Sequence, residues 1–340
     1  MFEPKNVDLT DRLQKAIGCK RQSCRTYASQ ITRLWTTMNP DKAMPKNLKW
    51  LDSEKVLNHI SKIVSLVKKK NLLVGVLSGM RLLESPRKRE KTKKMLMEAD
   101  ANYNSFLTSG KKPIRFKNPA KTWEKILKLP DVIRKVANAH GVLQKGERAT
   151  HPEYNIAQQL LFSLFVASSP PRRLDYRHLR LITPHDYANL DPDVLNSSNW
   201  IVMGRGVWKW ETLRFKTRDS HGPISTTLPQ RIKKYLQRMK HLTLAKNSNG
   251  YIFLTRKWKP MAASTFSSFV QSMFKTYLGL KKVGMNQIRS LYVSQFYKDA
   301  PQSIKMLEIS RQMGTSIPTQ LKHYRISVPT KDEDQAPTQG

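Results

Sequence analysis

The stretch Gln312-Met313-Gly314-Thr315-Ser316-Ile317-Pro318-Thr319-Gln320-Leu321-Lys322-His323-Tyr324 is predicted to form the last ordered helix of the chain. Its final residue is a tyrosine, and a phenol can form a covalent phosphoester. Arg172, Lys216 and Arg289 precede it along the chain. A planar guanidinium matches phosphate oxygens, and a lysine ammonium can protonate a leaving oxygen. These four side chains are therefore the parts needed to cut a phosphodiester without a metal ion.

Each of the three cations has a distinct local setting. The first arginine lies in Pro170-Pro171-Arg172-Arg173-Leu174-Asp175-Tyr176, just after a predicted apolar helix. The lysine lies in Phe215-Lys216-Thr217-Arg218, between two predicted strands, and the second arginine ends Asn286-Gln287-Ile288-Arg289, at the start of a predicted helix. The fold must bring these distant segments together if they share one site.

The charge of the chain predicts a polyanionic partner. Its 340 residues include 61 Lys and Arg against 25 Asp and Glu, a formal charge of +36. Phosphate neutralisation and counterion release favour nucleic acid as the partner of such a chain. Ribosomal and capsid-internal proteins share this charge, so it does not indicate catalysis. No apolar run reaches the roughly 18 to 20 residues of a membrane span, which argues against a membrane partner.

The two cysteines, Cys19 and Cys24, form one Cys-x4-Cys pair, with no second pair and no histidine cluster nearby. A zinc site or a disulfide framework needs more ligands or more cysteines. Both residues are therefore predicted to be reduced thiols in an intracellular protein. We expect no metal ion and no other cofactor.

The first part of the chain is predicted to be helical, with helical periodicity at 23–38, 56–67 and 86–107. A glycine, two prolines and several lysines interrupt this pattern between 109 and 121 and predict a basic linker. The predicted order is an N-terminal arm 1–14, a helical domain 15–110, a basic linker 111–121, a second domain 122–328 that carries the candidate catalytic residues, and a disordered tail 329–340.

The second domain is predicted to be mostly helical with a small antiparallel sheet. Strand signals occur at 200–203, 212–215 and 224–228, separated by turn residues. Helices are predicted at 123–140, 152–168, 231–242, 264–278, 286–297 and 303–313. The chain as a whole is therefore predicted to be mainly α with a small antiparallel β-sheet.

The basic run Arg87-Lys88-Arg89-Glu90-Lys91-Thr92-Lys93-Lys94 has three readings. It is a solvated helix face, a surface that faces DNA, or a nuclear address. The last two rest on charge alone.

In their order and spacing these motifs resemble the tyrosine recombinase (phage-type integrase) superfamily, and especially the integrases of eukaryotic DNA viruses and Crypton-type mobile elements. In that family an arginine precedes an acidic residue by three positions, as Arg172 precedes Asp175. A lysine in a β-hairpin is matched by Lys216, and the arginine of a His-x-x-Arg helix is matched by Arg289. The nucleophile is matched by Tyr324. The resemblance covers about 150–325, and the helical part before it is similar to the family's core-binding domain.

Two positions depart from the family pattern. The histidine of the His-x-x-Arg helix is replaced by Asn286, and the His or Trp nine residues before the nucleophile is replaced by Thr315. Asparagine and threonine donate hydrogen bonds, but neither takes a proton at neutral pH as imidazole does. The resemblance therefore implies phosphate contacts at both positions without acid–base help, and slower chemistry.

The resemblance implies a fold, a mechanism and partners. The fold would be a helical core-binding domain and an α+β catalytic domain that clamp double-stranded DNA. The partner would be DNA bound by a homotetramer, inside a cell, in the host nucleus or at a viral replication site. The implied catalytic set consists of Arg172, Lys216, Asn286, Arg289, Thr315 and Tyr324.

Alternative assignments remain at each catalytic position. Arg173 competes with Arg172, and Arg218 competes with Lys216; any of these cations can instead belong to an ordinary basic surface. Tyr324 can be a packing residue, in which case the fallback nucleophiles are Tyr292 and Tyr297.

The remaining polar candidates near these motifs are assigned simpler roles. His178 and His185 are expected to be structural loop residues, and His323 is expected on the surface, since it points about 100° away from the tyrosine on a helix. A default turn role is expected for His221, although flexibility can bring it near a phosphate. Asp175 is expected to fix its turn or to orient an arginine.

Three other functions remain open. A type IB topoisomerase or a telomere resolvase would use the same chemistry without strand exchange. A catalytically weakened, DNA-binding descendant would explain Asn286 and Thr315. A packaging protein would need none of the catalytic set.

Overall fold

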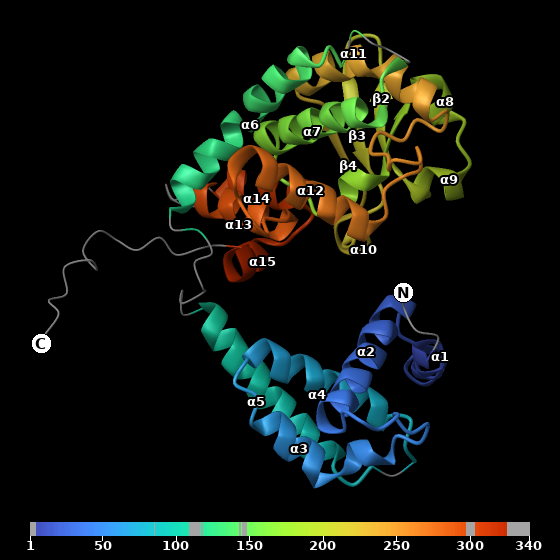
Figure 1. The fold of residues 1–340 in the computed structure, drawn as a ribbon, viewed down its shortest axis with the longest axis vertical. Coiled ribbons are helices and arrows are strands. Elements are labelled where there is room, and N and C mark those ends of the chain that lie inside the picture. Colours follow the sequence, from blue (N-terminus) through green and yellow to red (C-terminus); the bar gives the residue numbers. More distant parts are fainter. Residues whose placement is uncertain are drawn as a thin grey trace, which may run out of the picture. The chain divides into compact units, whose positions relative to one another are not determined.

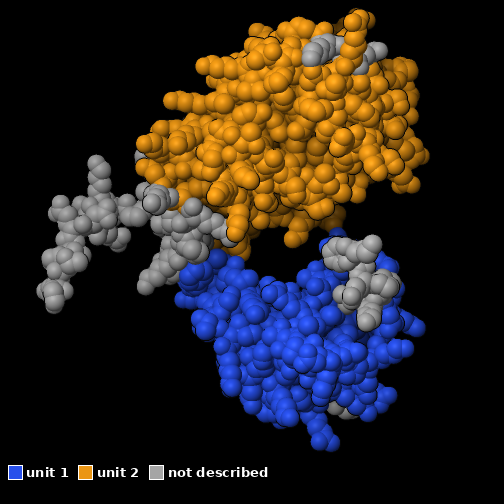
Figure 2. Space-filling view, in the orientation of Figure 1, with its two compact units in different colours: residues 1–112 blue, residues 113–340 orange. Residues whose placement is uncertain are grey.

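The computed structural model of the chain describes residues 5–84, 86–108, 116, 118–142, 144, 148–296 and 303–324. The chain divides into two compact units, residues 1–112 and 113–340 (Figure 2). Most of the expected basic linker and the whole expected tail lie outside the described residues, as does Tyr297. None of the helices in the described ranges is long and apolar enough to cross a membrane.

Unit 1 is helical. Its elements are α1 (Lys5–Ile17), α2 (Arg21–Met38), a short 3-10 turn (Lys49–Asp52), α3 (Glu54–Ser61), α4 (Leu66–Met80) and α5 (Arg89–Thr108) (Figure 1). Residues 5–14 of the expected N-terminal arm form most of α1. Leu9 and Leu13 of that helix are buried in the core of the unit, so this part of the arm belongs to the folded unit.

One predicted helix of unit 1 is in fact two. The sequence predicted a continuous helix over 56–67, but α3 ends at Ser61 and α4 begins at Leu66. The hydroxyl of Ser65 accepts a hydrogen bond from the backbone N–H of Lys68 at 3.4 Å, which caps the new helix. The capping signal thus overrides the apolar periodicity.

Part of the basic run in unit 1 contacts the unit itself. The carboxylate of Glu54 pairs with Lys88 at 3.0 Å and also with Lys91. The carboxylate of Asp52 accepts the backbone N–H groups of Arg87 and Lys88 at 2.8 and 2.6 Å. These acidic partners fix the start of α5, and DNA contact by the rest of the run stays a prediction.

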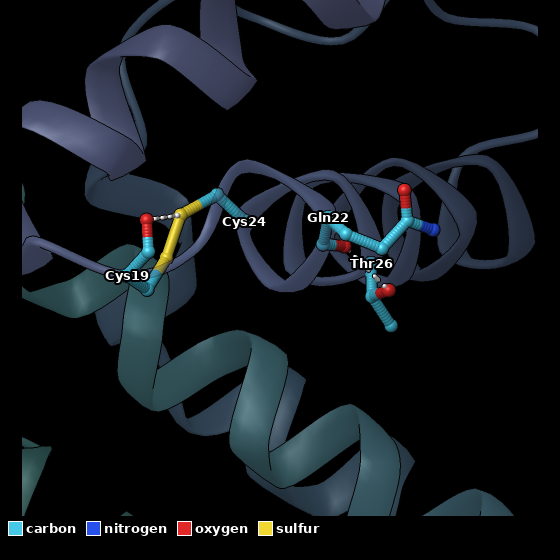
Figure 3. Close-up of a disulfide and its surroundings, with 4 residues drawn as sticks. All are labelled: Cys19, Gln22, Cys24 and Thr26. Carbon is cyan, nitrogen blue, oxygen red and sulfur yellow. Dashed lines mark hydrogen bonds between the residues drawn. A yellow bond between two sulfur atoms is a disulfide. The ribbon is translucent and has the colours of Figure 1, made fainter. Parts of the chain in front are cut away.

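The prediction for the cysteines was wrong. Cys19 and Cys24 are joined by a disulfide, with their Cα atoms 6.2 Å apart (Figure 3). The separation is within the range that a disulfide can span. It arises because Cys19 precedes α2 and Cys24 lies in its first turn, a proximity that the count of cysteines does not reveal.

Unit 2 carries all the candidate catalytic residues. Its long helices are α6 (Pro119–Ala139), α7 (His151–Ser168), α11 (Gln230–Lys246), α12 (Ala263–Leu278), α13 (Met285–Phe296) and α14 (Ser303–Met313). Its short elements are a 3-10 turn (Asp175–His178), α8 (Pro184–Ala188), α9 (Pro192–Ser197), α10 (Arg218–His221), α15 (Ile317–Thr319) and a π-turn (Gln320–Tyr324). The mainly helical class with a small sheet is confirmed.

The sheet of unit 2 is mixed rather than antiparallel. Its strands are β1 (Leu179–Ile182), β2 (Asn199–Met203), β3 (Trp208–Thr212) and β4 (Ile224–Thr227), in that spatial order. β1 pairs with β2 in parallel, and the other two pairs are antiparallel. β1 was not predicted from the sequence. The strand predicted at 212–215 corresponds to β3, which spans Trp208–Thr212 instead.

Helix α7 is the central helix of unit 2. The carboxylate of Glu153 accepts hydrogen bonds from the backbone N–H and the hydroxyl of Thr150, which fixes the start of the helix. The helix packs against α6 and α11 (Figure 1). Its rings Phe162 and Phe165 make edge contacts with the buried ring of Tyr176. This packing anchors the turn that holds the first candidate arginine.

Candidate active site

The turn after α7 is built around the buried Tyr176. Pro170 and Pro171 end the helix, because proline removes an N–H donor and disfavours helix in the residue before it. The backbone N–H of Arg172 then donates to the hydroxyl of Tyr176 at 3.1 Å. Since Tyr176 is held in the aromatic core, this bond fixes the position of Arg172.

Arg172 is buried, with 2% of its surface exposed. Its guanidinium carbon lies 3.9 Å from the ring centroid of Trp210 on β3. Burial lowers the pKa of Arg172 to about 10, while the fields of Tyr176, Asp175 and Glu211 oppose the shift. The Nη1 atom is buried and has no hydrogen-bond partner. A buried cation with an unpaired donor is costly, and an anion would relieve that cost.

Arg289 on α13 is fully buried and links two distant segments. Its Nη1 donates to the carbonyl oxygens of Pro171 and Met313, both at 3.3 Å. Its Nε and Nη2 atoms are buried without partners. Burial lowers the pKa of Arg289 and the charge of Arg173 adds to this shift, whereas Tyr324 and Asp175 oppose it. One arginine thus joins the first motif to the turn before the tyrosine, and two of its N–H groups remain unpaired.

Tyr324 has a packed ring and a polar hydroxyl environment. The ring lies among Val293, Ile309 and Met313, and the guanidinium carbon of Arg289 is 4.6 Å from its centroid. The Nη2 of Arg173 lies 3.5 Å from the hydroxyl oxygen, toward which it donates. Burial raises the pKa of the phenol, but the charges of Arg289 and Arg173 outweigh burial and lower it. These two charges therefore make the Tyr324 phenol more acidic than an ordinary tyrosine.

Tyr324 does not lie on a continuous helix from Gln312. Helix α14 ends at Met313, Gly314 adopts a positive φ of 59°, and Ser316 caps the next short helix, α15. The chain then continues in a π-turn that ends at Tyr324. The predicted single helix 312–324 is therefore wrong, because the glycine and the cap interrupt it.

The turn before the tyrosine contacts the segment that carries Lys216. The hydroxyl of Thr217 donates to the carbonyl oxygen of Gly314 at 2.6 Å. A Cβ atom at Gly314 would lie 3.1 Å from the ring of Phe215. Lys216 itself is exposed in the connection between β3 and β4. The two flanking contacts place its backbone beside the turn.

Thr315 is buried, with 2% of its surface exposed. Its hydroxyl accepts a hydrogen bond from the Nε2 of Gln320 at 3.3 Å. Its backbone N–H donates to the carbonyl oxygen of Ser310 at 3.0 Å, and the Ser310 hydroxyl donates to the carbonyl oxygen of Thr315. Thr315 is thus held in the same turn that Arg289 contacts through Met313.

Two neighbouring pockets contain the remaining candidates. A pocket of about 360 Å³ is lined by Arg173, Asn286, Ser290, Thr319, His323 and Tyr324. A second pocket of about 610 Å³ also has Arg173 and Asn286 in its wall, together with Lys216. Arg172 lines neither; it borders a third pocket with Trp210. Arg173 and Asn286 therefore line both the pocket of Tyr324 and the pocket of Lys216, whereas Arg172 lines neither.

The carboxyl of Asp175 lies in the electrostatic field of three arginines. Burial raises the pKa of its carboxyl, and the charges of Arg172, Arg289 and Arg173 act in the opposite direction. All three guanidinium groups therefore lie within electrostatic range of one carboxyl. Orientation of an arginine by Asp175 stays a prediction.

Tyr292, the alternative nucleophile within the described residues, packs against the same hydrophobic cluster as Tyr324 but does not line the pocket of Tyr324. Tyr292 stacks on Phe296, and its ring meets Trp123 edge-on. Burial raises the pKa of Tyr292 to about 12, and the charge of Glu308 adds to the shift. Its phenol is therefore a poorer nucleophile than that of Tyr324.

Arg173, the alternative to Arg172, is the arginine of the doublet that lies beside Tyr324. It lies near the tyrosine hydroxyl and lines both pockets, while its neighbour Arg172 is buried and lines neither. The Arg-Arg doublet was the available signal. After the end of a helix the side chains follow no regular period, so the sequence does not predict which of the two arginines points toward Tyr324.

The polar side chains of the site include no metal cluster. Within the ranges that the structure describes, no group of three or more His, Cys, Asp or Glu side chains is placed to hold a metal ion.

No protein-family model matches the chain, and the search of curated proteins finds no match.

Proposed function

We propose that this chain is a site-specific DNA recombinase or integrase that cuts and rejoins DNA through a covalent bond between Tyr324 and a 3′-phosphate. The observation that carries the proposal is the pair of buried arginines. Arg172 and Arg289 together hold three buried N–H-bearing atoms without partners, and Arg289 lies against the ring of Tyr324. Phosphate oxygens are acceptors that match such donors.

The proposed cleavage step is a transesterification. The oxygen of Tyr324 attacks phosphorus after its proton has passed to water, and the bond from phosphorus to the 5′-oxygen breaks. Lys216 gives a proton to that leaving oxygen, which becomes a 5′-hydroxyl. A 5′-hydroxyl then attacks the phosphotyrosine and reverses the exchange, so the bond energy is kept in the linkage. Neither ATP nor a metal ion takes part in this scheme.

The arginines supply the main stabilisation in this scheme. Arg289 and Arg172 neutralise the charge that develops on the non-bridging oxygens, since fixed donors in a buried site need no reorganisation. Arg173 lies at the tyrosine hydroxyl and favours the phenolate. We assign hydrogen bonds to the phosphate to Asn286 and Thr315, without proton transfer.

The proposed partners follow from charge and from the family resemblance. The formal charge of +36 supports double-stranded DNA as the ligand. A homotetramer on two DNA sites and a location with DNA, in a nucleus or at a viral replication site, belong to the same proposal. Mass photometry of the chain with DNA would measure the assembly.

A nicked suicide substrate tests the chemistry. A pool of duplexes with random sequence beside the nick supplies the unknown target, and the loss of a short 5′-hydroxyl fragment prevents religation. We expect a covalent protein–DNA species on a denaturing gel with the wild-type chain, and its sequencing identifies the target.

Two tyrosine variants make the test specific. Tyr324→Phe should form no covalent species, while Tyr292→Phe, at a partly buried tyrosine of the same fold unit, should form it at close to the wild-type rate. An unchanged yield in Tyr324→Phe, or no species in the wild type with any member of the pool, would refute the proposed chemistry. DNA binding without any such species would favour the non-catalytic descendant.

A further inference from the structure

The larger of the two neighbouring pockets contains a cationic wall that the proposed mechanism does not use. Its volume is about 610 Å³, and the wall is formed by Arg177, His178 and Arg214. Lys216 lies in the same pocket, and Arg173 and Asn286 are shared with the pocket of Tyr324. The wall is therefore next to the candidate site and separate from Tyr324.

His178 lies among positive charges. Burial, and after it the charges of Arg177 and Arg214, lower its pKa to about 3. Burial, together with the charge of Arg214, also lowers the pKa of Arg177. The carboxyl of Asp175 is the acidic group that lines this pocket, and burial raises its pKa. Burial, and after it the charges of Arg177 and Arg214, therefore keep the His178 ring neutral near pH 7.

Hydrogen bonds fix Arg214 of the wall and its backbone. The Nη1 of Arg214 donates to the carbonyl oxygen of Ser197 at 2.7 Å, at the end of α9. The backbone N–H of Arg214 donates to the side-chain oxygen of Asn199 at 2.7 Å. The same Asn199 side chain donates to the carbonyl oxygen of Asp175 at 2.9 Å. One buried asparagine thus ties the two segments that line the pocket.

We propose that this pocket binds a second phosphate group of the DNA strand, next to the phosphate that Tyr324 attacks, and that His178 takes up a proton from solvent when this phosphate binds. This proposal rests on the proposed function only in the claim that the bound phosphate belongs to the DNA strand. The claim that the pocket binds an anion depends only on the cationic residues that line the pocket.

The direction of the pH dependence follows from linkage. A phosphate in the pocket supplies the negative charge that the wall lacks, so it raises the pKa of His178 in the complex. The affinity of the pocket for phosphate then rises as the pH falls through the pKa that His178 has in the complex. It stops rising only below the pKa of the free state. Within that window one proton is taken up per phosphate, so affinity changes by at most about tenfold per pH unit.

The test measures the ring of His178 directly in the full-length Tyr324→Phe chain, in which the proposed cleavage cannot occur. Sulfate is the first probe, because it is tetrahedral and keeps its charge across the range, and a short single-stranded oligonucleotide is the second. NMR titration of the histidine rings between about pH 5 and 8 reports protonation. Calorimetry over the same range reports affinity.

We expect the His178 ring to stay neutral without ligand and to titrate within this range when either probe is bound. Affinity should rise toward low pH in the parent chain and should lose this dependence in His178→Gln. The matched control is His185→Gln, at a side chain with 85% exposure, and it should keep the dependence. The comparison of His178 with and without probe needs no substitution at that position, so it does not depend on how the variant folds.

Two results would overturn the inference. One is a His178 ring whose titration neither probe changes. The other is a response to sulfate alone, which would make the pocket a site for free anions and not for a strand. Because the measurement uses Tyr324→Phe, its outcome is independent of whether Tyr324 forms a covalent bond. Failure of the gel assay and failure of this assay are therefore distinguishable.

Discussion

At the scale of single residues, the candidate site combines unpaired buried cations with one phenol. Arg172 has an unpaired Nη1, and Arg289 has an unpaired Nε and Nη2. Buried donors without partners are rare in folded proteins, because each forfeits its bonds to water. Such donors are expected to lower the stability of the free protein and to be satisfied when a ligand is bound.

The first prediction concerns Arg172. Arg172→Met replaces a buried, unpaired cation with an apolar side chain that can still pack on Trp210, so the free energy of unfolding should rise by about 1 kcal/mol. The same variant should slow formation of the covalent species by about a hundredfold or more. Urea unfolding and the nicked-substrate assay measure the two effects.

The matched control for this prediction is Arg180→Met. Arg180 also stacks on aromatic rings, those of Trp200 and Tyr251, but its Nε donates to the carbonyl oxygen of Asn249 at 2.7 Å. This substitution should destabilise the protein, because it removes a paired donor. Equal destabilisation by both substitutions would contradict the argument about unpaired donors.

The second prediction concerns Arg173 and pH. The charges of Arg289 and Arg173 lower the pKa of Tyr324 against the effect of burial, so Arg173→Gln should raise that pKa. The covalent species should then form more slowly near neutral pH, and its rate should recover as the pH rises. Arg218→Gln, at the rival position beside Lys216, is the control. An unchanged pH–rate profile in Arg173→Gln would exclude this role for Arg173.

At the scale of elements, the site depends on a few buried polar contacts between segments far apart in sequence. Arg289 on α13 binds the carbonyl oxygens of Pro171 and Met313. Thr217, after β3, binds the carbonyl oxygen of Gly314. Four segments thus meet at the turn between α14 and α15, and a change in that turn should disturb all of them.

The third prediction concerns this turn. Gly314→Ala places a Cβ 3.1 Å from the Phe215 ring at a φ of 59°, so the free energy of unfolding should fall by at least about 1 kcal/mol. Formation of the covalent species should also slow, because the segment with Lys216 and the turn with Thr315 shift together. Thermal unfolding and the nicked-substrate assay test this.

Gly206→Ala is the control for the turn. No atom lies within 4 Å of a Cβ at Gly206, so this substitution should change stability by less than about 0.5 kcal/mol. If the two variants behave alike, Gly314 does not have the role assigned to it.

At the scale of the whole molecule, the dominant property is charge. The chain carries +36, and a protein that neutralises many phosphates releases many counterions. The fourth prediction is that DNA affinity of Tyr324→Phe falls by about a thousandfold or more between about 50 and 200 mM salt. Fluorescence anisotropy measures it. A fall of less than about tenfold would contradict the proposed extent of phosphate contact.

Much of the helical fold could be predicted because its signals are local. Pro152 at the start of α7 and Pro170-Pro171 after its end fix the bounds of this helix within a residue. The strand β1 could not be predicted in this way, since it has four residues and pairs in parallel with a strand that follows a crossover. The disulfide was missed for a related reason, because two cysteines alone carry no pairing signal.

The candidate site could be predicted in part. The order of Arg172, Arg289 and Tyr324 was visible as spaced motifs. In the structure Arg289 contacts both the ring of Tyr324 and the turn before it, whereas Arg172 borders a different pocket. The pocket wall of His178 and Arg214 was not visible, because these residues meet only through the pairing of β1, β2 and β3. Side-chain direction and strand pairing are set by tertiary packing, which a linear pattern does not contain.

In the proposed mechanism, cations that are distant in the sequence and Tyr324 act on one phosphorus atom. Mass spectrometry of the species trapped on the nicked substrate tests it most directly, since it identifies both the modified residue and the strand end. We expect a nucleotide joined through its 3′-phosphate to Tyr324, with release of a 5′-hydroxyl fragment. Attachment to another residue, or attachment through a 5′-phosphate, would contradict it.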